Sequence, residues 1–86
     1  MRMYPYMVMK DKTGVLHSEV YEEDGDKKVE IHFQRPKDDG YDVAYCIIPE
    51  FKWIKREGFT REEIRNFEVF LRDNVYWIYE YAKETT

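Results

Sequence analysis

Residues 15–33 read VLHSEVYEEDGDKKVEIHF, two runs rich in strand-forming residues separated by Asp24-Gly25. Asp-Gly is the preferred pair for the two-residue loop of a type I′ turn, because both positions need a positive φ. This loop sets the register of the two strands: Glu23–Asp26, Glu22–Lys27, Val20–Val29, Ser18–Ile31 and Leu16–Phe33. The larger apolar residues then share one face, which a slip of one residue would destroy. The stretch therefore predicts an antiparallel hairpin of residues 15–22 and 28–34.

The sequence predicts further strands on either side of this hairpin. Residues 2–10 and 41–48 carry apolar side chains on both faces, which is typical of a strand that is covered twice or lies in an interface. Pro5 cannot donate to a ladder, so we expect the first of these strands at an edge. We expect residues 35–40 to form a loop and residues 51–54 to form a short edge strand.

The C-terminal third predicts one long helix over residues 61–83, because no Pro or Gly interrupts it. Thr60 and Glu63 have the spacing of a capping box, in which each side chain satisfies a backbone donor near the other. Apolar residues at helical spacing predict the core-facing stripe: Ile64, Phe67, Leu71, Val75, Ile78 and Ala82. The simplest arrangement is α+β, an antiparallel sheet of about four strands with the helix packed on one face.

The length and composition indicate a single domain, residues 1–86. Eight Tyr, five Phe and two Trp supply enough aromatic surface for a core without disulfides or metal ions. Cys46 is the only cysteine, which excludes an internal disulfide, and no apolar run approaches the ~20 residues of a membrane span. We therefore expect a cytoplasmic protein that makes no membrane contact.

The residue types that catalysis uses are present, but they form no recognisable motif. In the predicted register His17 and His32 face each other across the hairpin, where they could supply part of a metal site. Glu19 and Glu30 lie on the same face, but no third ligand has a clear claim. An exposed cross-strand pair is the simpler interpretation, so we expect no enzymatic activity and no cofactor or metal.

The net charge of −4 is unevenly distributed along the chain. Four acidic residues surround the predicted turn: Glu22, Glu23, Asp24 and Asp26. They lack the spaced ligand pattern of a calcium loop. Two interpretations remain: a solvated turn that blocks aggregation, or a contact for a basic protein partner.

The predicted helix also carries apolar residues outside its core-facing stripe. Val69 and Tyr76 lie on the opposite side, Tyr79 lies off the stripe, and Trp77 lies partly outside it. Clustered exposed apolar surface tends to mark an interface. These four residues and the acidic ones around the turn are the predicted partner-binding residues, either for another protein or for a second copy of the chain.

One segment has a more specific pattern. Pro49-Glu50-Phe51 is followed by Gly58, Thr60 and Glu62-Glu63 at the start of the predicted helix. This pattern resembles the HicB-type antitoxin domain, and the opening Tyr4-Pro5 strand is similar to the start of that domain.

The resemblance covers about half of the chain and has departures. Residues 15–37 would be an insertion, and Lys52-Trp53-Ile54 stand where Pro-Gly-Cys is usual in that family. The resemblance implies a sheet-and-helix domain that neutralises a small RNA-cleaving toxin by docking on it.

These features favour a small acidic, non-enzymatic inhibitor of a nucleic-acid-handling protein, antitoxin-like or of the phage anti-defence (anti-CRISPR-like) kind. One alternative is a homo-oligomeric structural module, a homodimer joined through the first strand or the outer helix face. Another is weak nucleic-acid binding through the basic and aromatic residues of segment 52–65: Lys52, Trp53, Lys55, Arg56, Arg61 and Arg65. The negative net charge argues against direct nucleic-acid binding.

Overall fold

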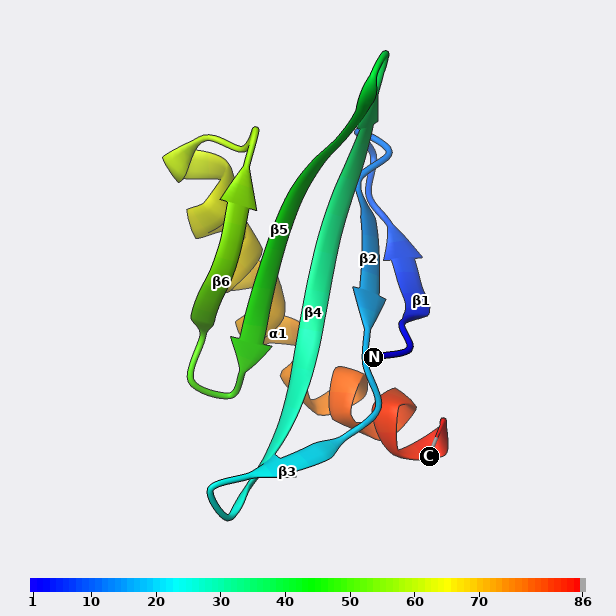
Figure 1. Cartoon of the computed structure of the whole chain (residues 1–86), viewed down its shortest axis with the longest axis vertical. Coiled ribbons are helices and arrows are strands. Elements are labelled where there is room, and N and C mark those ends of the chain that lie inside the picture. The colour runs from blue at the N-terminus through cyan, green and yellow to red at the C-terminus, as the bar shows by residue number, and fades with distance from the viewer. Residues whose placement is uncertain (86) are drawn as a thin grey trace.

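The computed structural model describes residues 1–85, which form one antiparallel sheet with one helix across a single face (Figure 1). The strands are β1 (Tyr4–Val8), β2 (Gly14–His17), β3 (Tyr21–Glu23), β4 (Asp26–Lys37), β5 (Gly40–Ile48) and β6 (Lys52–Glu57). Their order is β1-β2-β4-β5-β6, and β3 pairs with β4 beyond the end of β2. The helix α1 spans Arg61–Glu84. The predicted α+β class is confirmed, with more strands than the four expected.

The turn at Asp24-Gly25 joins β3 to β4 as predicted. Its two residues have φ values of 54° and 84°, as a type I′ loop requires. Glu23 faces Asp26 and Glu22 faces Lys27, so the predicted register is confirmed at this end of the hairpin.

The register shifts by one residue between β3 and β2. Residues 19–20 span the distance that Val29 alone spans on β4, so Leu16 faces His32 and not Phe33. Ser18 explains the shift, because its hydroxyl accepts the backbone N–H of residue 30 at 2.9 Å in place of a ladder carbonyl. The predicted Leu16–Phe33 and Ser18–Ile31 pairs are wrong for this reason.

The core lies between the sheet and α1. Phe33 stacks on Phe67 with ring centroids 4.1 Å apart, and Phe59 meets Phe67 edge to face at 5.0 Å. The predicted helix stripe is confirmed, with Val75 at its half-buried margin, and so is the capping box of Thr60 and Glu63. The buried apolar residues are Val15, Val29, Ile31, Phe33, Ala44, Cys46, Ile48, Ile64, Phe67, Leu71, Ile78 and Ala82.

Two connections differ from the prediction. Residues 35–40 are not a loop, because β4 continues to Lys37 and a two-residue turn leads directly into β5. Pro36 is tolerated there because β2 pairs with β4 only as far as Gln34, which leaves one edge of β4 open. At the sheet margins, β1 is an edge strand as Pro5 predicts, and β6 is a longer edge strand than expected.

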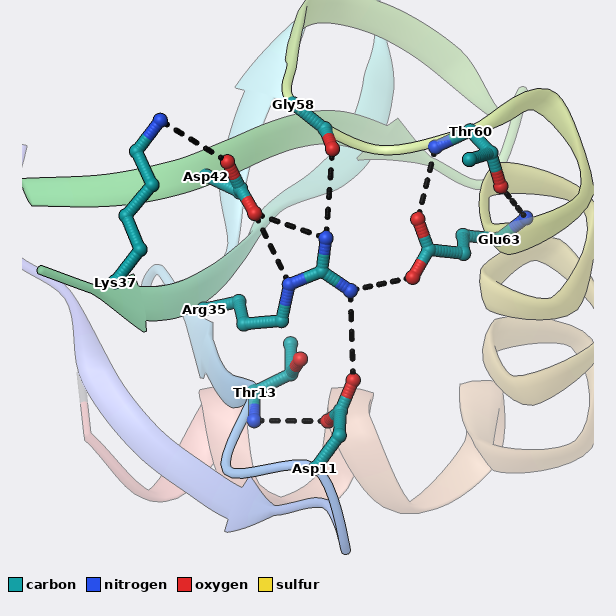
Figure 2. Close-up of polar contacts among 8 residues, drawn as sticks. All are labelled: Asp11, Thr13, Arg35, Lys37, Asp42, Gly58, Thr60 and Glu63. Atoms are coloured by element: carbon teal, nitrogen blue, oxygen red, sulfur yellow. Dashed lines mark hydrogen bonds and ion pairs between the residues drawn. The ribbon is translucent and has the colours of Figure 1, made fainter.

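Arg35, near the end of β4, is held by acceptors from several separate segments (Figure 2). Its Nε and Nη2 donate to Asp42 Oδ2 on β5 at 3.0 and 2.8 Å. Its Nη1 donates to Glu63 in the first turn of α1 and lies 3.7 Å from Asp11 Oδ2, in the β1–β2 turn. The Gly58 carbonyl accepts from Nη2 at 3.4 Å. One guanidinium thus connects the β1–β2 turn, the β6–α1 connection and the start of α1 to the sheet.

The backbone at Gly58 is specific to glycine. Its φ is 92°, and an added Cβ would lie 1.9 Å from Asp42 Oδ1. We expect Gly58→Ala to lower the free energy of unfolding by about 2 kcal/mol or more in urea denaturation. Gly25→Ala is the matched control, because φ is 84° with open space around it, and should cost about 1 kcal/mol. Equal losses would mean that the Asp42 contact is unimportant.

The Arg35 network should make stability depend on pH. Arg35 lowers the pKa of Asp42, and the Thr60 backbone N–H lowers the pKa of Glu63. A carboxyl group with a lowered folded-state pKa stabilises the fold above its ordinary pKa, and loses this effect as the pH falls through the folded-state value. The Tm should therefore fall between about pH 5 and pH 3.

An Arg35→Met variant separates this network from other acid effects. At pH 7 its Tm should be lower by about 5 °C or more, because Asp42 and Glu63 lose their cation. The gap between the two proteins should narrow below about pH 4, where the carboxyl groups become neutral. A gap that stays constant across this range would contradict the role given to Arg35.

Candidate functional site

The acidic tip (Glu22, Glu23, Asp24 and Asp26) projects beyond the end of β2, at the turn between β3 and β4 (Figure 1). All four side chains are exposed. Glu23 accepts from Lys28 at 3.3 Å, whereas the other three make no ion pair within residues 1–85. The structure thus leaves three carboxylates of the tip available and uses the fourth internally.

Lys28 anchors the base of the acidic tip. Its side chain is only 9% exposed and also donates to Glu50 at 2.8 Å. This hydrogen bond raises the pKa of Lys28, so the cation persists at neutral pH. The tip is therefore held to the β5–β6 turn by an ion pair whose cation is almost fully buried.

The outer helix patch consists of Val69, Tyr76 and Trp77, which are 51%, 63% and 56% exposed. The rings of Tyr76 and Trp77 meet edge to face at 5.0 Å. Tyr79 does not belong to this patch, because its hydroxyl donates to the Lys27 carbonyl at 2.8 Å and its ring packs against the core. Of the four helix residues proposed for partner binding, Tyr76 and Trp77 lie together, Val69 is exposed two turns earlier, and Tyr79 fastens α1 to β4.

The C-terminal end of α1 lies next to the acidic tip. A hollow of about 300 Å³ between them is lined by Val20, Tyr21, Glu22, Lys27 and Lys83. The structure thereby joins two regions that are about 60 residues apart in the chain. Sequence patterns could not place them together, because the pairing depends on the diagonal path of α1 across the sheet (Figure 1).

A second hollow, the tyrosine pocket, has a volume of about 440 Å³. Its lining comes from β1, the end of β2 and the last turn of α1: Tyr4, Pro5, Tyr6, His17, Tyr81, Glu84 and Thr85. Sequence reasoning missed this site. The one available signal was the pair of tyrosines flanking Pro5, whose apolar faces were assigned to packing or an interface.

The two histidines lie on opposite faces of the sheet, so the prediction that they face each other is wrong. The one-residue shift at 19–20 turns His17 into the core side, where it is 2% exposed, and leaves His32 on the other face. His32 Nε2 lies 2.6 Å from Glu30 Oε2, and its ring stacks on Tyr45 at 3.6 Å. Within residues 1–85 no three His, Cys, Asp or Glu side chains are placed to share a metal ion.

Segment 52–65 forms β6 and the start of α1. The Trp53 indole N–H donates to Glu68 Oε2 at 2.7 Å, so its ring is turned toward the helix. Lys55 lies over the Tyr45 ring and pairs with Glu57 at 3.5 Å. The basic side chains are exposed, but the tryptophan is not presented to stack on a base.

Cys46 is fully buried, and burial raises the pKa of its thiol to about 12, so it stays protonated at neutral pH. No helix within the described residues combines the length and the apolarity that a membrane span needs.

The segments that resemble the HicB-type domain lie at the β5–β6 turn and at the start of α1. Residues 15–37, an insertion in that comparison, supply β2, β3 and β4, and so the middle of the sheet. Comparisons with models of protein families, with curated proteins and with solved structures find no match for this chain.

Proposed function

We propose that this chain is a non-enzymatic binding module that inhibits a nucleic-acid-handling protein by docking its acidic end on a basic surface. The acidic end is the region around the acidic tip and the C-terminal turns of α1. The observation that carries the proposal is the projecting, anchored tip, whose three outer carboxylates have no cation to neutralise them within the described residues.

The distribution of charge supports this assignment. Glu22, Asp24 and Asp26 of this end meet no cation among the described residues, whereas Glu23 and Glu50 share Lys28 and Glu80 pairs with Lys83. A charge gathered at one end orients the molecule as it approaches a basic partner.

The rigidity of the acidic tip also supports the docking proposal. The type I′ turn fixes the backbone of the tip, and Lys28 ties its base to Glu50. A charged surface that is already ordered loses little conformational entropy when it binds. Nucleic-acid-handling proteins expose basic channels to bind phosphates, and this tip offers such a channel an alternative anion.

The test begins with the tagged chain in a lysate of its natural host, with and without nuclease. We expect a stoichiometric basic protein that survives nuclease treatment and whose nucleic-acid activity falls when the chain is added. Capture of nothing except the chain itself would contradict the proposal.

With that partner purified, the acidic tip can be tested directly. Glu22→Gln, Asp24→Asn and Asp26→Asn together should weaken binding by about tenfold or more and flatten its salt dependence. The control removes the same charge elsewhere, with Asp38→Asn, Asp39→Asn and Glu57→Gln, and should keep most of the affinity. Unchanged affinity in the tip variant would remove the tip from the interface.

The resemblance to HicB-type antitoxin domains favours one kind of partner, a small RNA-cleaving toxin. Coexpression with the captured partner tests this point. We expect growth arrest by the partner alone, rescue by the chain, and loss of rescue with the tip variant.

A second copy of this chain is the other candidate partner, because Tyr76 and Trp77 expose a joined aromatic surface. This candidate predicts a dimer whose light-scattering mass rises with concentration. Trp77→Arg should shift the dimer toward the monomer, since it places a charge in the contact. A strict monomer at about 200 µM, well above a micromolar Kd, would exclude this role.

A further inference from the structure

The walls of the tyrosine pocket are neutral aromatic rings. Tyr6 and Tyr81 meet at a centroid distance of 5.7 Å, and Tyr4 stacks on His17 at 5.8 Å. The Tyr6 hydroxyl donates to Asn74 Oδ1 at 2.9 Å, and the Tyr4 hydroxyl donates to Glu19 Oε1 at 3.0 Å. Burial raises the pKa of Tyr6, and the hydrogen bond to Glu19 raises that of Tyr4. The rings are thus fixed, uncharged and rich in π-electron density.

His17 supplies a hydrogen-bond acceptor to the pocket. Its Nδ1 lies 2.8 Å from the Ser18 carbonyl oxygen, which can only accept, so Nδ1 carries the proton. In the neutral ring Nε2 then holds a lone pair. No described side chain or backbone group donates to Nε2, and His17 lines the pocket. This acceptor is left for a ligand that donates.

The rim of the pocket is negative. Glu84 lies in the last turn of α1, and Thr85 caps that helix end. Unpaired carbonyl groups give a helix C-terminus about half a negative charge, which favours cations. The Glu84 side chain is exposed and makes no ion pair among the described residues.

The chain itself places a cation against one of these rings. The Arg2 guanidinium lies 5.4 Å from the centroid of the Tyr4 ring. Aromatic faces attract ammonium and guanidinium groups at such distances. The tyrosine rings, His17 and Glu84 therefore favour the same ligand, a positively charged group that donates hydrogen bonds.

We propose that the tyrosine pocket binds the ammonium or guanidinium end of an organic cation, such as a lysine or arginine side chain. The volume of about 440 Å³ admits a group of this size. The site stands on its own geometry, and the proposed function bears only on the source of the cation. A basic partner docked on the acidic end would insert such a side chain between β1 and the C-terminal end of α1.

The first experiment titrates ¹⁵N-labelled protein with tert-butylammonium chloride, whose ammonium group can donate hydrogen bonds, at constant ionic strength and follows the amide resonances. We expect saturable shifts at residues 4–6, 17–18 and 81–85, with a Kd on the order of 1–10 mM. tert-Butanol is the uncharged probe of similar size and should produce no saturable shift there. Equal binding of tert-butanol, or no saturation by about 50 mM tert-butylammonium, would overturn the proposal.

Two variants locate the effect. Tyr81→Leu and Glu84→Gln should each weaken binding about threefold to tenfold, because one removes a ring and the other a charge. Both side chains are exposed, so the fold should persist. Tyr76→Leu is the matched control on the outer side of α1 and should leave the Kd unchanged. Equal loss in Tyr76→Leu would place the cation elsewhere.

The source of the cation is decided by a second set of probes. Short acetylated, amidated peptides with one lysine or one arginine are compared with free tert-butylammonium. Tighter binding of the peptides than of the free cation assigns the site to a partner's side chain. Equal affinities assign it to a small free cation. These titrations use no protein partner, so their failure would leave the docking proposal standing, and failure of the capture experiment would leave this site standing.

Discussion

Arg35 carries the one interaction on which the arrangement of the segments depends. The β1–β2 turn, β5, the β6–α1 connection and the start of α1 are separate in sequence, and each gives this guanidinium an acceptor. Carboxylates brought this close would repel one another without a cation among them. The planar group satisfies them together, and it also lies 4.6 Å from the Phe59 ring, which closes the core at that end. The fold is thus stabilised by ion pairs at one end and by aromatic packing along its middle.

This arrangement separates the ends of the molecule by task. The Arg35 end uses its charges internally, since Asp11, Asp42 and Glu63 all meet a cation. At the opposite end, three carboxylates of the acidic tip have no ion pair among the described residues. The two hollows lined by the last turns of α1 also lie at this end. A long helix running diagonally across the sheet connects the two (Figure 1). The end that needs least internal pairing is therefore the one that is free to meet a partner.

Local patterns predicted the type I′ turn, the capped helix and its core-facing stripe, because each depends on neighbours a few residues away. The register of β2 could not be predicted from local patterns. The Ser18 hydroxyl replaces a backbone acceptor, and this shifts the pairing of β2 with β4 by one residue. Arg35 was overlooked because its partners lie up to 28 residues away along the chain. The acidic tip was visible as a run of charge, but Lys28 withdraws Glu23 from it. The tyrosine pocket needed the meeting of β1 with the far end of α1, which no single-sequence periodicity encodes.

The extra residue at positions 19–20 has a consequence for how the chain tolerates length changes. It acts as a half-turn rotation of β2 about its own axis, so its two faces are exchanged relative to the strand that the turn alone would dictate. Removing one residue there would bring the hairpin back into phase, place Leu16 inside and put His17 on the open face. A single-codon deletion would thus replace Val15 by Leu16 in the core and remove the acceptor from the tyrosine pocket. In this protein the number of residues between β2 and β3, more than the identity of any residue in them, decides which face of the sheet carries the His17 side chain.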